Sequence, residues 1–122
     1  LPPGFHFQPT DEEIVFQYLA RKTFSRPLPA PVVVHDIDIL NMDPWDFPGH
    51  SEQDRYFFNR VTGCSDDRGI KRTCTGFWKP TGFQKLIVGS GRMPMVGIKR
   101  TVVFYMERNR RAVRTSWFMN VY

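Results

Sequence analysis

The chain has 122 residues, enough for one domain with a buried core, and 41% of them are hydrophobic and 15% aromatic. Its two cysteines and three scattered histidines show no spacing typical of a disulfide framework or a zinc site, so we expect no metal or other cofactor and a reducing setting. No apolar run is long enough to span a membrane, and no signal peptide is visible. Because the chain begins at Leu1 without a methionine, we expect it to be part of a longer protein.

The net charge of +5 is distributed unevenly along the chain. Residues 1–54 carry three basic and nine acidic side chains, a net charge of −6, whereas residues 55–122 carry fourteen basic and three acidic ones, a net charge of +11. A solvated basic face is the simpler reading. So large an asymmetry within one domain nevertheless favours a side that binds a polyanion, with nucleic acid the preferred candidate.

The first half of the chain predicts one helix. Residues 1–8 read as extended, and Thr10 with Glu13 forms a capping box, with Asp11 and Glu12 at the positive end of the helix dipole. Apolar residues at helical spacing follow, and the helix should end before Pro27. A proline-rich connector over 27–34, an alternating segment over 36–40 and a short helical turn capped by Asp43 complete this half, with Trp45 and Phe47 packing on the core.

The second half predicts a meander of strands. We expect strands over 55–58, 86–88, 96–105 and 115–122, separated by a polar loop over 59–73 and a basic loop over 108–114. The whole therefore reads as one α+β domain over 1–122, a twisted antiparallel β-sheet flanked by the N-terminal helix and the short helical turn.

The stretch 74–85 carries the most specific functional signal. Alternation along a strand would turn Trp78 into a core and present Lys79 and Thr81 outward. Pro80 lacks a backbone donor, which favours a sheet edge or a bulge. The alternative without a functional role is a core strand whose lysines only keep the surface soluble.

The basic residues around this stretch suit double-stranded DNA. Lys79 and Lys85 could reach guanine acceptors in the major groove, and Thr81 could meet a base edge. Basic loops on either side would hold phosphates and set the register, through Arg60, Arg68, Lys71, Arg72, Arg108, Arg111 and Arg114. Catalysis finds little support, because no phosphate-binding loop, nucleophile elbow or paired acid and base is visible.

Several spaced motifs resemble those of the DNA-binding domain of the NAC (NAM/ATAF/CUC) family of plant transcription factors. They occur in the family's order along nearly the whole chain: Leu1-Pro2-Pro3-Gly4-Phe5, Pro9-Thr10-Asp11-Glu12-Glu13, Tyr18-Leu19, Asp43-Pro44-Trp45, Tyr56-Phe57-Phe58, Gly76-Phe77-Trp78-Lys79-Pro80-Thr81-Gly82, Val96-Gly97-Ile98-Lys99, Val103-Phe104-Tyr105 and Arg114-Thr115-Ser116-Trp117-Phe118-Met119.

This resemblance implies a nuclear protein that binds promoter DNA as a homodimer, or as a heterodimer with relatives. The family's strand edge enters the major groove, which carries over to Lys79, Thr81, Gly82 and Lys85, with Trp78 structural. Its dimer contacts carry over to an N-terminal segment and one carboxylate: Leu1, Pro2, Phe5, His6, Phe7, Gln8 and Glu13.

The chain departs from the family pattern at several positions. Pro80 stands where the family has alanine, which could alter base preference, and we expect the family's further C-terminal strand to be missing. His6 replaces the family's arginine that pairs with the carboxylate at Glu13 across the dimer. Since an unperturbed histidine is mostly neutral near pH 7, we expect a weaker dimer that acid favours.

Two rival readings stay open beside sequence-specific DNA binding. One is a dimerisation-only module that sequesters relatives without binding DNA well. The other is nonspecific binding of RNA or another polyanion through the basic half, which exposed aromatic platforms would favour.

Overall fold

A computed structural model describes residues 8–28, 35–49, 54–59, 69–91 and 96–122. The chain forms two compact units. The first, here called the helical unit, comprises Leu1–Val33, Phe83–Arg100 and Tyr122. The second, here called the aromatic unit, comprises Val34–Gly82 and Thr101–Val121. Two long strands run through both units.

The helical unit contains one continuous helical segment, as the sequence predicts. It consists of α1 (Asp11–Glu13), a π-helical stretch η1 (Ile14–Leu19) and α2 (Ala20–Thr23). The predicted capping box is present, since Thr10 N–H donates to Glu13 Oε1 over 3.2 Å and Glu13 N–H donates to Thr10 Oγ1 over 3.1 Å. The π-helical stretch was not predicted.

The helix packs closely on the strands of its own unit. Val15 and Ile87 are buried there. Gly97 permits the close approach, because a Cβ at this position would lie 2.4 Å from Val15 Cγ1. Gly97 and Lys99 on β5 and Lys85 on β4 therefore face the helix, whereas Phe83 of the same β4 segment is 98% exposed.

Short elements of the aromatic unit correct three predictions. The alternating segment is a strand only at β1 (His35–Ile37), after which the 3₁₀ turn η2 (Ile39–Asn41) follows. The next strand is shifted along the chain, to β2 (Phe57–Asn59), and it pairs with β1 in parallel rather than antiparallel fashion. The helical turn η3 (Pro44–Asp46) is where it was expected, but Asp43 does not cap it. Instead the buried Asp43 carboxylate accepts from Thr75 N–H.

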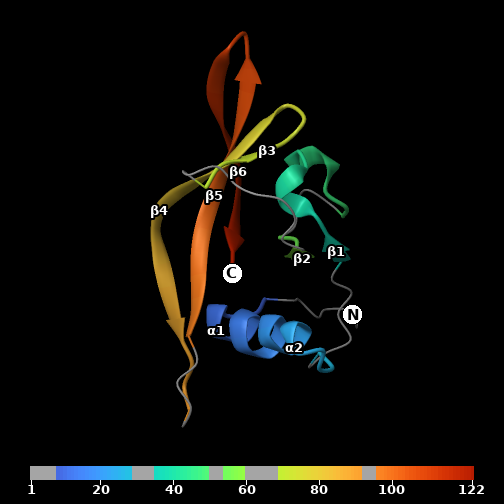
Figure 1. Cartoon of the computed structure of the whole chain (residues 1–122), viewed down its shortest axis with the longest axis vertical. Helices are drawn as coiled ribbons and strands as arrows, with labels where there is room; N and C mark the ends of the chain where they lie inside the picture. Colours follow the sequence, from blue (N-terminus) through green and yellow to red (C-terminus); the bar gives the residue numbers. More distant parts are fainter. Residues whose placement is uncertain (1–7, 29–34, 50–53, 60–68, 92–95) are drawn as a thin grey trace. The chain divides into compact units, whose positions relative to one another are not determined.

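The main sheet has four strands in the order β3-β4-β5-β6, and Figure 1 shows their arrangement. They are β3 (Lys71–Arg72), β4 (Gly76–Val88), β5 (Val96–Arg108) and β6 (Arg111–Val121). The twisted antiparallel sheet with a helix confirms the α+β prediction. Lys71 and Arg72 therefore lie in a strand, not in the predicted polar loop, whose residues 60–68 lie outside the described chain.

The predicted basic loop over 108–114 is instead a tight hairpin. β5 and β6 are joined by Asn109 and Arg110 alone, with φ values of 48° and 64° (Figure 1). Two successive residues with positive φ define a type I′ turn, whose twist matches that of the flanking strands. Arg108 and Arg111 consequently lie at strand ends opposite each other.

The core of the aromatic unit forms around Trp78 and Phe104, which are 1% and 0% exposed. Their ring centroids are 5.0 Å apart, and Trp78 Nε1–H donates to Met42 O over 3.0 Å. Phe47 stacks on Trp78, as predicted, and Trp45 meets Phe104 edge to face, although 46% of Trp45 is exposed. A buried, hydrogen-bonded tryptophan fixes the position of β4 in this unit.

Candidate nucleic-acid interface

Side chains alternate sharply along β4 where it passes through the aromatic unit. Trp78 is buried in the core, while Lys79, the next residue, is exposed. Lys71 pairs with Trp78 and Arg72 with Phe77, and Gly69 lies beside Pro80, since a Cβ on Gly69 would be 3.1 Å from the proline ring. The predicted outward orientation of Lys79 agrees with its exposure. Its predicted position at a sheet edge stays a prediction, because residues 60–68 before β3 lie outside the described chain.

Lys79 belongs to a surface cluster that we call the lysine face, made of Arg72, Phe77, Lys79 and Tyr105. The Phe77 and Tyr105 rings stack with centroids 5.3 Å apart and planes inclined by 6°. The Lys79 Nζ atom lies 5.8 Å from the Tyr105 centroid, and Arg72 Cζ lies 5.7 Å from that of Phe77. Two cations thus flank a stacked aromatic pair on the side of the sheet away from the Trp78 core.

The two cations of the lysine face differ in how far their charge is compensated. Arg72 forms a salt bridge with Glu107 at 2.5 Å, and 69% and 47% of the two side chains are exposed. Exposed pairs of this kind contribute little stability, on the order of 0–1 kcal/mol, but the nearby carboxylate weakens the attraction of Arg72 for an anion. Lys79 lies over a neutral ring, and among the described residues no carboxylate forms an ion pair with it.

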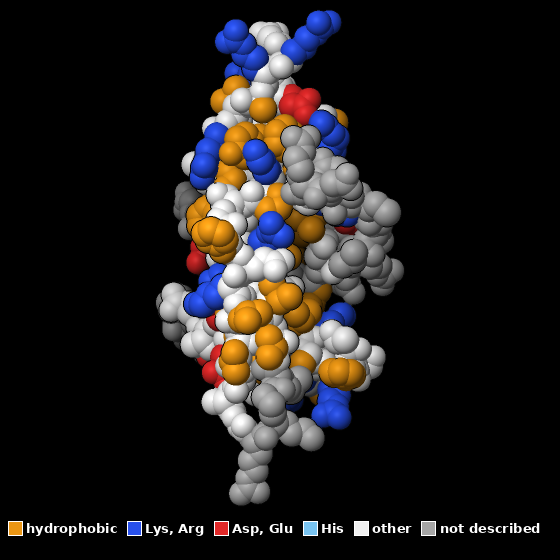
Figure 2. Space-filling view, turned by 60° about the vertical axis from the view of Figure 1, so that its left-hand side comes forward, with side chains coloured by type: hydrophobic (Ala, Val, Ile, Leu, Met, Phe, Trp, Pro, Cys, Tyr) orange, Lys and Arg blue, Asp and Glu red, His pale blue; other side chains and the backbone are white. Residues whose placement is uncertain are grey.

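The β5–β6 hairpin carries a second group of cations. Arg108, Arg110, Arg111 and Arg114 are all exposed, and within the described part of the chain none of them forms an ion pair. Figure 2 shows Lys and Arg side chains projecting at the end of this hairpin. Strand alternation places Arg114 on the same side of the sheet as Lys79, and Arg108 and Arg111 on the other side, at the tip.

Thr81 and Gly82 follow Lys79 on the same strand. Thr81 is half-buried, whereas Gly82 is exposed and has a φ of 71°. This left-handed conformation is rare for residues with a side chain and interrupts the regular geometry of β4. Gly82 therefore has a backbone role that its motif alone did not reveal.

Lys85, the second predicted base-reading lysine, lies in the helical unit in a different environment. Its Nζ is 3.5 Å from Asp11 Oδ2. Asp11 also accepts from Lys99 Nζ at 3.1 Å to each oxygen and from Tyr122 Oη at 2.5 Å. The Tyr122 hydroxyl, followed by Lys99 and Lys85, holds the pKa of Asp11 below its usual range despite some burial. The charge of Lys85 is thus shared with a carboxylate.

Several predicted site residues lie outside the described chain: Arg60, Arg68, Leu1, Pro2, Phe5, His6 and Phe7. Of the remaining dimer candidates, Gln8 and Glu13 are exposed. Lys71 lies in β3 opposite Trp78.

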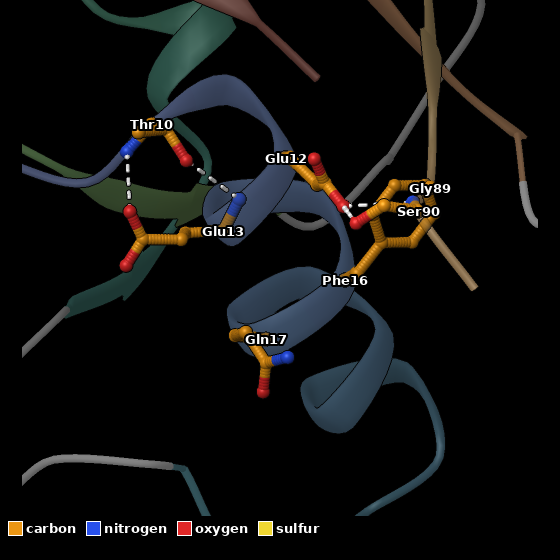
Figure 3. Close-up of a pocket in the computed structure, with 7 residues that line it drawn as sticks. All are labelled: Thr10, Glu12, Glu13, Phe16, Gln17, Gly89 and Ser90. Carbon is orange, nitrogen blue, oxygen red and sulfur yellow. Dashed lines mark hydrogen bonds between the residues drawn. The ribbon is translucent and has the colours of Figure 1, made fainter.

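A pocket of about 250 Å³ lies in the helical unit, where the start of the helix meets the end of β4 (Figure 3). Two of its polar pairs are already satisfied. Thr10 and Glu13 bond reciprocally, and Glu12 Oε1 accepts from both the hydroxyl and the backbone N–H of Ser90, at 2.6 and 2.9 Å (Figure 3). The Ser90 hydroxyl lowers the pKa of Glu12. The Glu12–Ser90 contacts hold the helix start against the segment that follows β4.

Three residues that bear on the interface were not among the sequence candidates: Tyr105, Arg110 and Asp11. Asn109 before Arg110 was an available signal, since asparagine is favoured at the first position of a type I′ turn. The other two depend on pairing between distant segments, for which the sequence offers no local signal.

Among the residues that the structure describes, no cluster of three or more His, Cys, Asp or Glu side chains is placed to bind a metal ion. None of the helices in the described ranges has the length and apolar character needed to cross a membrane.

The fold and the site define a small α+β domain with an aromatic-packed sheet and exposed cations on β4 and on the β5–β6 hairpin. The chain belongs to the NAC domain family, since the family described as "No apical meristem (NAM) protein" matches residues 2–122. It is 45% identical over 124 residues to "NAC domain-containing protein 83" of Arabidopsis thaliana, covering all of this chain and 49% of that relative.

Other relatives give the same result. "NAC transcription factor 32" of Arabidopsis thaliana is 41% identical over 126 residues, covering 99% of this chain and 48% of the relative. "NAC domain-containing protein 68" of Oryza sativa subsp. japonica is 40% identical over 130 residues, covering all of this chain and 40% of the relative. The chain thus spans less than half the length of these curated relatives.

Proposed function

We propose that this domain binds double-stranded DNA sequence-specifically, by placing the edge of β4 at Lys79–Gly82 in the major groove, and that it regulates transcription in the nucleus as a dimer. Membership of a family that includes proteins named transcription factors supports the regulatory role. The major groove admits a strand pair, and its guanine acceptors suit a lysine. The chain acts as a binding module rather than an enzyme.

The observation that carries the proposal is that a fixed strand bears a lysine with no ion-pair partner among the described residues. Trp78 is buried and hydrogen-bonded, so the strand that bears Lys79 is fixed, while the Lys79 ammonium stays exposed over a neutral ring. A base-reading side chain benefits from such a rigid element, because less conformational freedom is lost on binding.

The hairpin arginines supply a different part of the binding energy. Arg108, Arg110, Arg111 and Arg114 have no ion-pair partner among the described residues, so each is available to a phosphate. Phosphate contacts hold the register without reading sequence. If six to eight cations of the domain contact phosphates, affinity should fall by on the order of 10³ or more between dilute and physiological salt.

Dimerisation is the second part of the proposal. The family resemblance assigns contacts to the N-terminal segment and to Glu13, whose Oε1 accepts from Thr10 N–H. With histidine at position 6, a protonated ring would pair with a carboxylate, so the dimer should be tighter at pH 6 than at pH 8. Analytical ultracentrifugation at both pH values measures this, and equally tight dimers at both would remove the idea.

Selection of bound duplexes from a random pool tests the function directly. We expect a short enriched sequence, and the selected duplex should bind more tightly than a scrambled duplex or either single strand. If the protein formed a dimer but enriched no duplex sequence, the dimerisation-only module would be supported. Tighter binding of single strands than of duplexes would support RNA binding. Either result would contradict the proposal.

A further inference from the structure

We propose that Tyr105 is a positioning residue that holds Lys79 ready for base readout, an inference that rests on the proposed function. Tyr105 lies on β5, and its ring is half-buried and stacked on Phe77. The Lys79 ammonium lies over that ring at 5.8 Å from its centroid. The ring therefore provides a fixed platform for an otherwise flexible side chain.

Physical chemistry explains why an aromatic platform suits this task. A lysine side chain is rotamer-rich, and ordering it on binding DNA costs free energy. A cation–π contact restricts the ammonium without using its three N–H donors, and within the described part of the chain no acceptor binds them. A carboxylate would restrict it equally well but would also compete with the base for the same charge. Tyr105 thus orders Lys79 without neutralising it.

The rest of the lysine face keeps the platform itself in place. Phe77 stacks on Tyr105 and pairs with Arg72 across β3 and β4, and Arg72 lies over the Phe77 ring. Glu107 holds Arg72 through the salt bridge. The order Arg72, Phe77, Tyr105, Lys79 is continuous, so the ring under Lys79 is supported from the far side.

The proposal predicts energetic coupling between Tyr105 and Lys79. Replacing Tyr105 by Leu should weaken binding of the selected duplex about two- to fivefold, as expected for an exposed cation–π contact, and leave a scrambled duplex nearly unchanged. Tyr105→Phe keeps the ring and should keep the affinity. In a Lys79→Ala background, Tyr105→Leu should have no further effect.

The matched control is Phe118→Leu, which removes an exposed aromatic ring from β6 without touching the lysine face. Two results would overturn the proposal. If Tyr105→Leu weakened the selected and the scrambled duplex equally, Tyr105 would have a structural role. If Tyr105→Leu weakened binding as much in the Lys79→Ala background as in the wild type, Tyr105 would act on DNA independently of Lys79. If the wild-type protein bound the selected and the scrambled duplex equally, the proposed function itself would be wrong.

A second measurement needs neither DNA nor a variant. In the free protein the Tyr105 ring current should move the ε-CH₂ proton resonances of Lys79 upfield of those of Lys85, which lies beside a carboxylate. Lys79 resonances without any upfield displacement would overturn the positioning role, whether or not the domain binds DNA and whether or not Tyr105→Leu folds.

Discussion

Lys79 and Lys85 lie six residues apart on one strand and carry the same charge in opposite surroundings. In the aromatic unit Lys79 lies over Tyr105, a neutral ring. In the helical unit Lys85 lies beside Asp11, which also binds Lys99 and Tyr122. The comparison shows that the charge a lysine offers to an anion depends on its neighbours. Lys79 is exposed beside a neutral ring, whereas Lys85, whose side chain is 66% exposed, belongs to the polar network around Asp11.

The largest effect is expected for Lys79→Ala. Loss of a base contact should reduce the affinity for the selected duplex by about 1–3 kcal/mol, with little change for a scrambled duplex. Fluorescence anisotropy with both duplexes at one salt concentration measures the difference. An equal loss of affinity for both duplexes would show that Lys79 contacts phosphate rather than a base. Lys79 would then not differ from Lys85 in its role.

Asp11→Asn should destabilise the helical unit by about 1–2 kcal/mol at pH 7, because three donors would lose a charged acceptor. The fold lowers the pKa of Asp11, so its stabilisation is complete above the ordinary value near 3.9 and is lost as pH falls through the lowered pKa. Urea denaturation should show a difference between wild type and variant that shrinks toward pH 3.

Asp46→Asn is the matched control, since Asp46 is exposed in η3 of the aromatic unit. Asp46→Asn should leave the free energy of unfolding unchanged at pH 7 and at pH 3. A difference for Asp11→Asn that persists undiminished at pH 3 would show that the carboxylate charge is not the source of stabilisation.

Arg110→Gly should act on stability and binding in opposite directions. Arg110 has a left-handed φ of 64°, which glycine adopts without strain, so stability should rise by about 0.5–1 kcal/mol even after the extra freedom of glycine in the unfolded chain. Affinity should fall alike for all duplexes, and the slope of log affinity against log salt should lose about 0.9 if Arg110 contacts one phosphate.

Arg111→Ala is the comparison variant, because Arg111 directly follows the turn as the first residue of β6. It should weaken all duplexes similarly without stabilising the fold, because Arg111 begins β6 in an extended conformation. Sequence-dependent weakening by either variant would contradict a phosphate role for the hairpin tip.

The smallest effect is expected for Lys85→Ala. Because Asp11 already compensates this charge, the selected duplex should lose less than about 0.5 kcal/mol at physiological salt. In an Asp11→Asn background the same substitution should cost more, since Lys85 is then free to meet DNA. An effect as large as that of Lys79→Ala would show that Asp11 does not restrain Lys85.

Local chemistry allowed part of the fold to be predicted from the sequence. The capping box of Thr10 and Glu13 and the turn at Pro44 depend on residues three or four positions apart, and both are present. Alternation around Trp78 predicted which side chain is buried and which is exposed. The NAC resemblance rests on such motifs, and the family match confirms it.

Other features depend on long-range pairing and left no local signal. The parallel pairing of β1 with β2 joins segments separated by about twenty residues, and Asp11 binds partners more than seventy residues away. The β5–β6 hairpin was mistaken for a loop because its arginines suggested a solvated segment, although Asn109 is a typical turn residue.

Replacement of single guanines by 7-deazaguanine in the selected duplex tests the central claim most directly, because it removes one major-groove acceptor and leaves the backbone intact. We predict that one guanine position costs the wild-type protein about tenfold in affinity, and that Lys79→Ala binds the modified and unmodified duplexes equally. Equal losses for wild type and Lys79→Ala at every guanine, or no loss at any, would contradict readout of the major groove by Lys79.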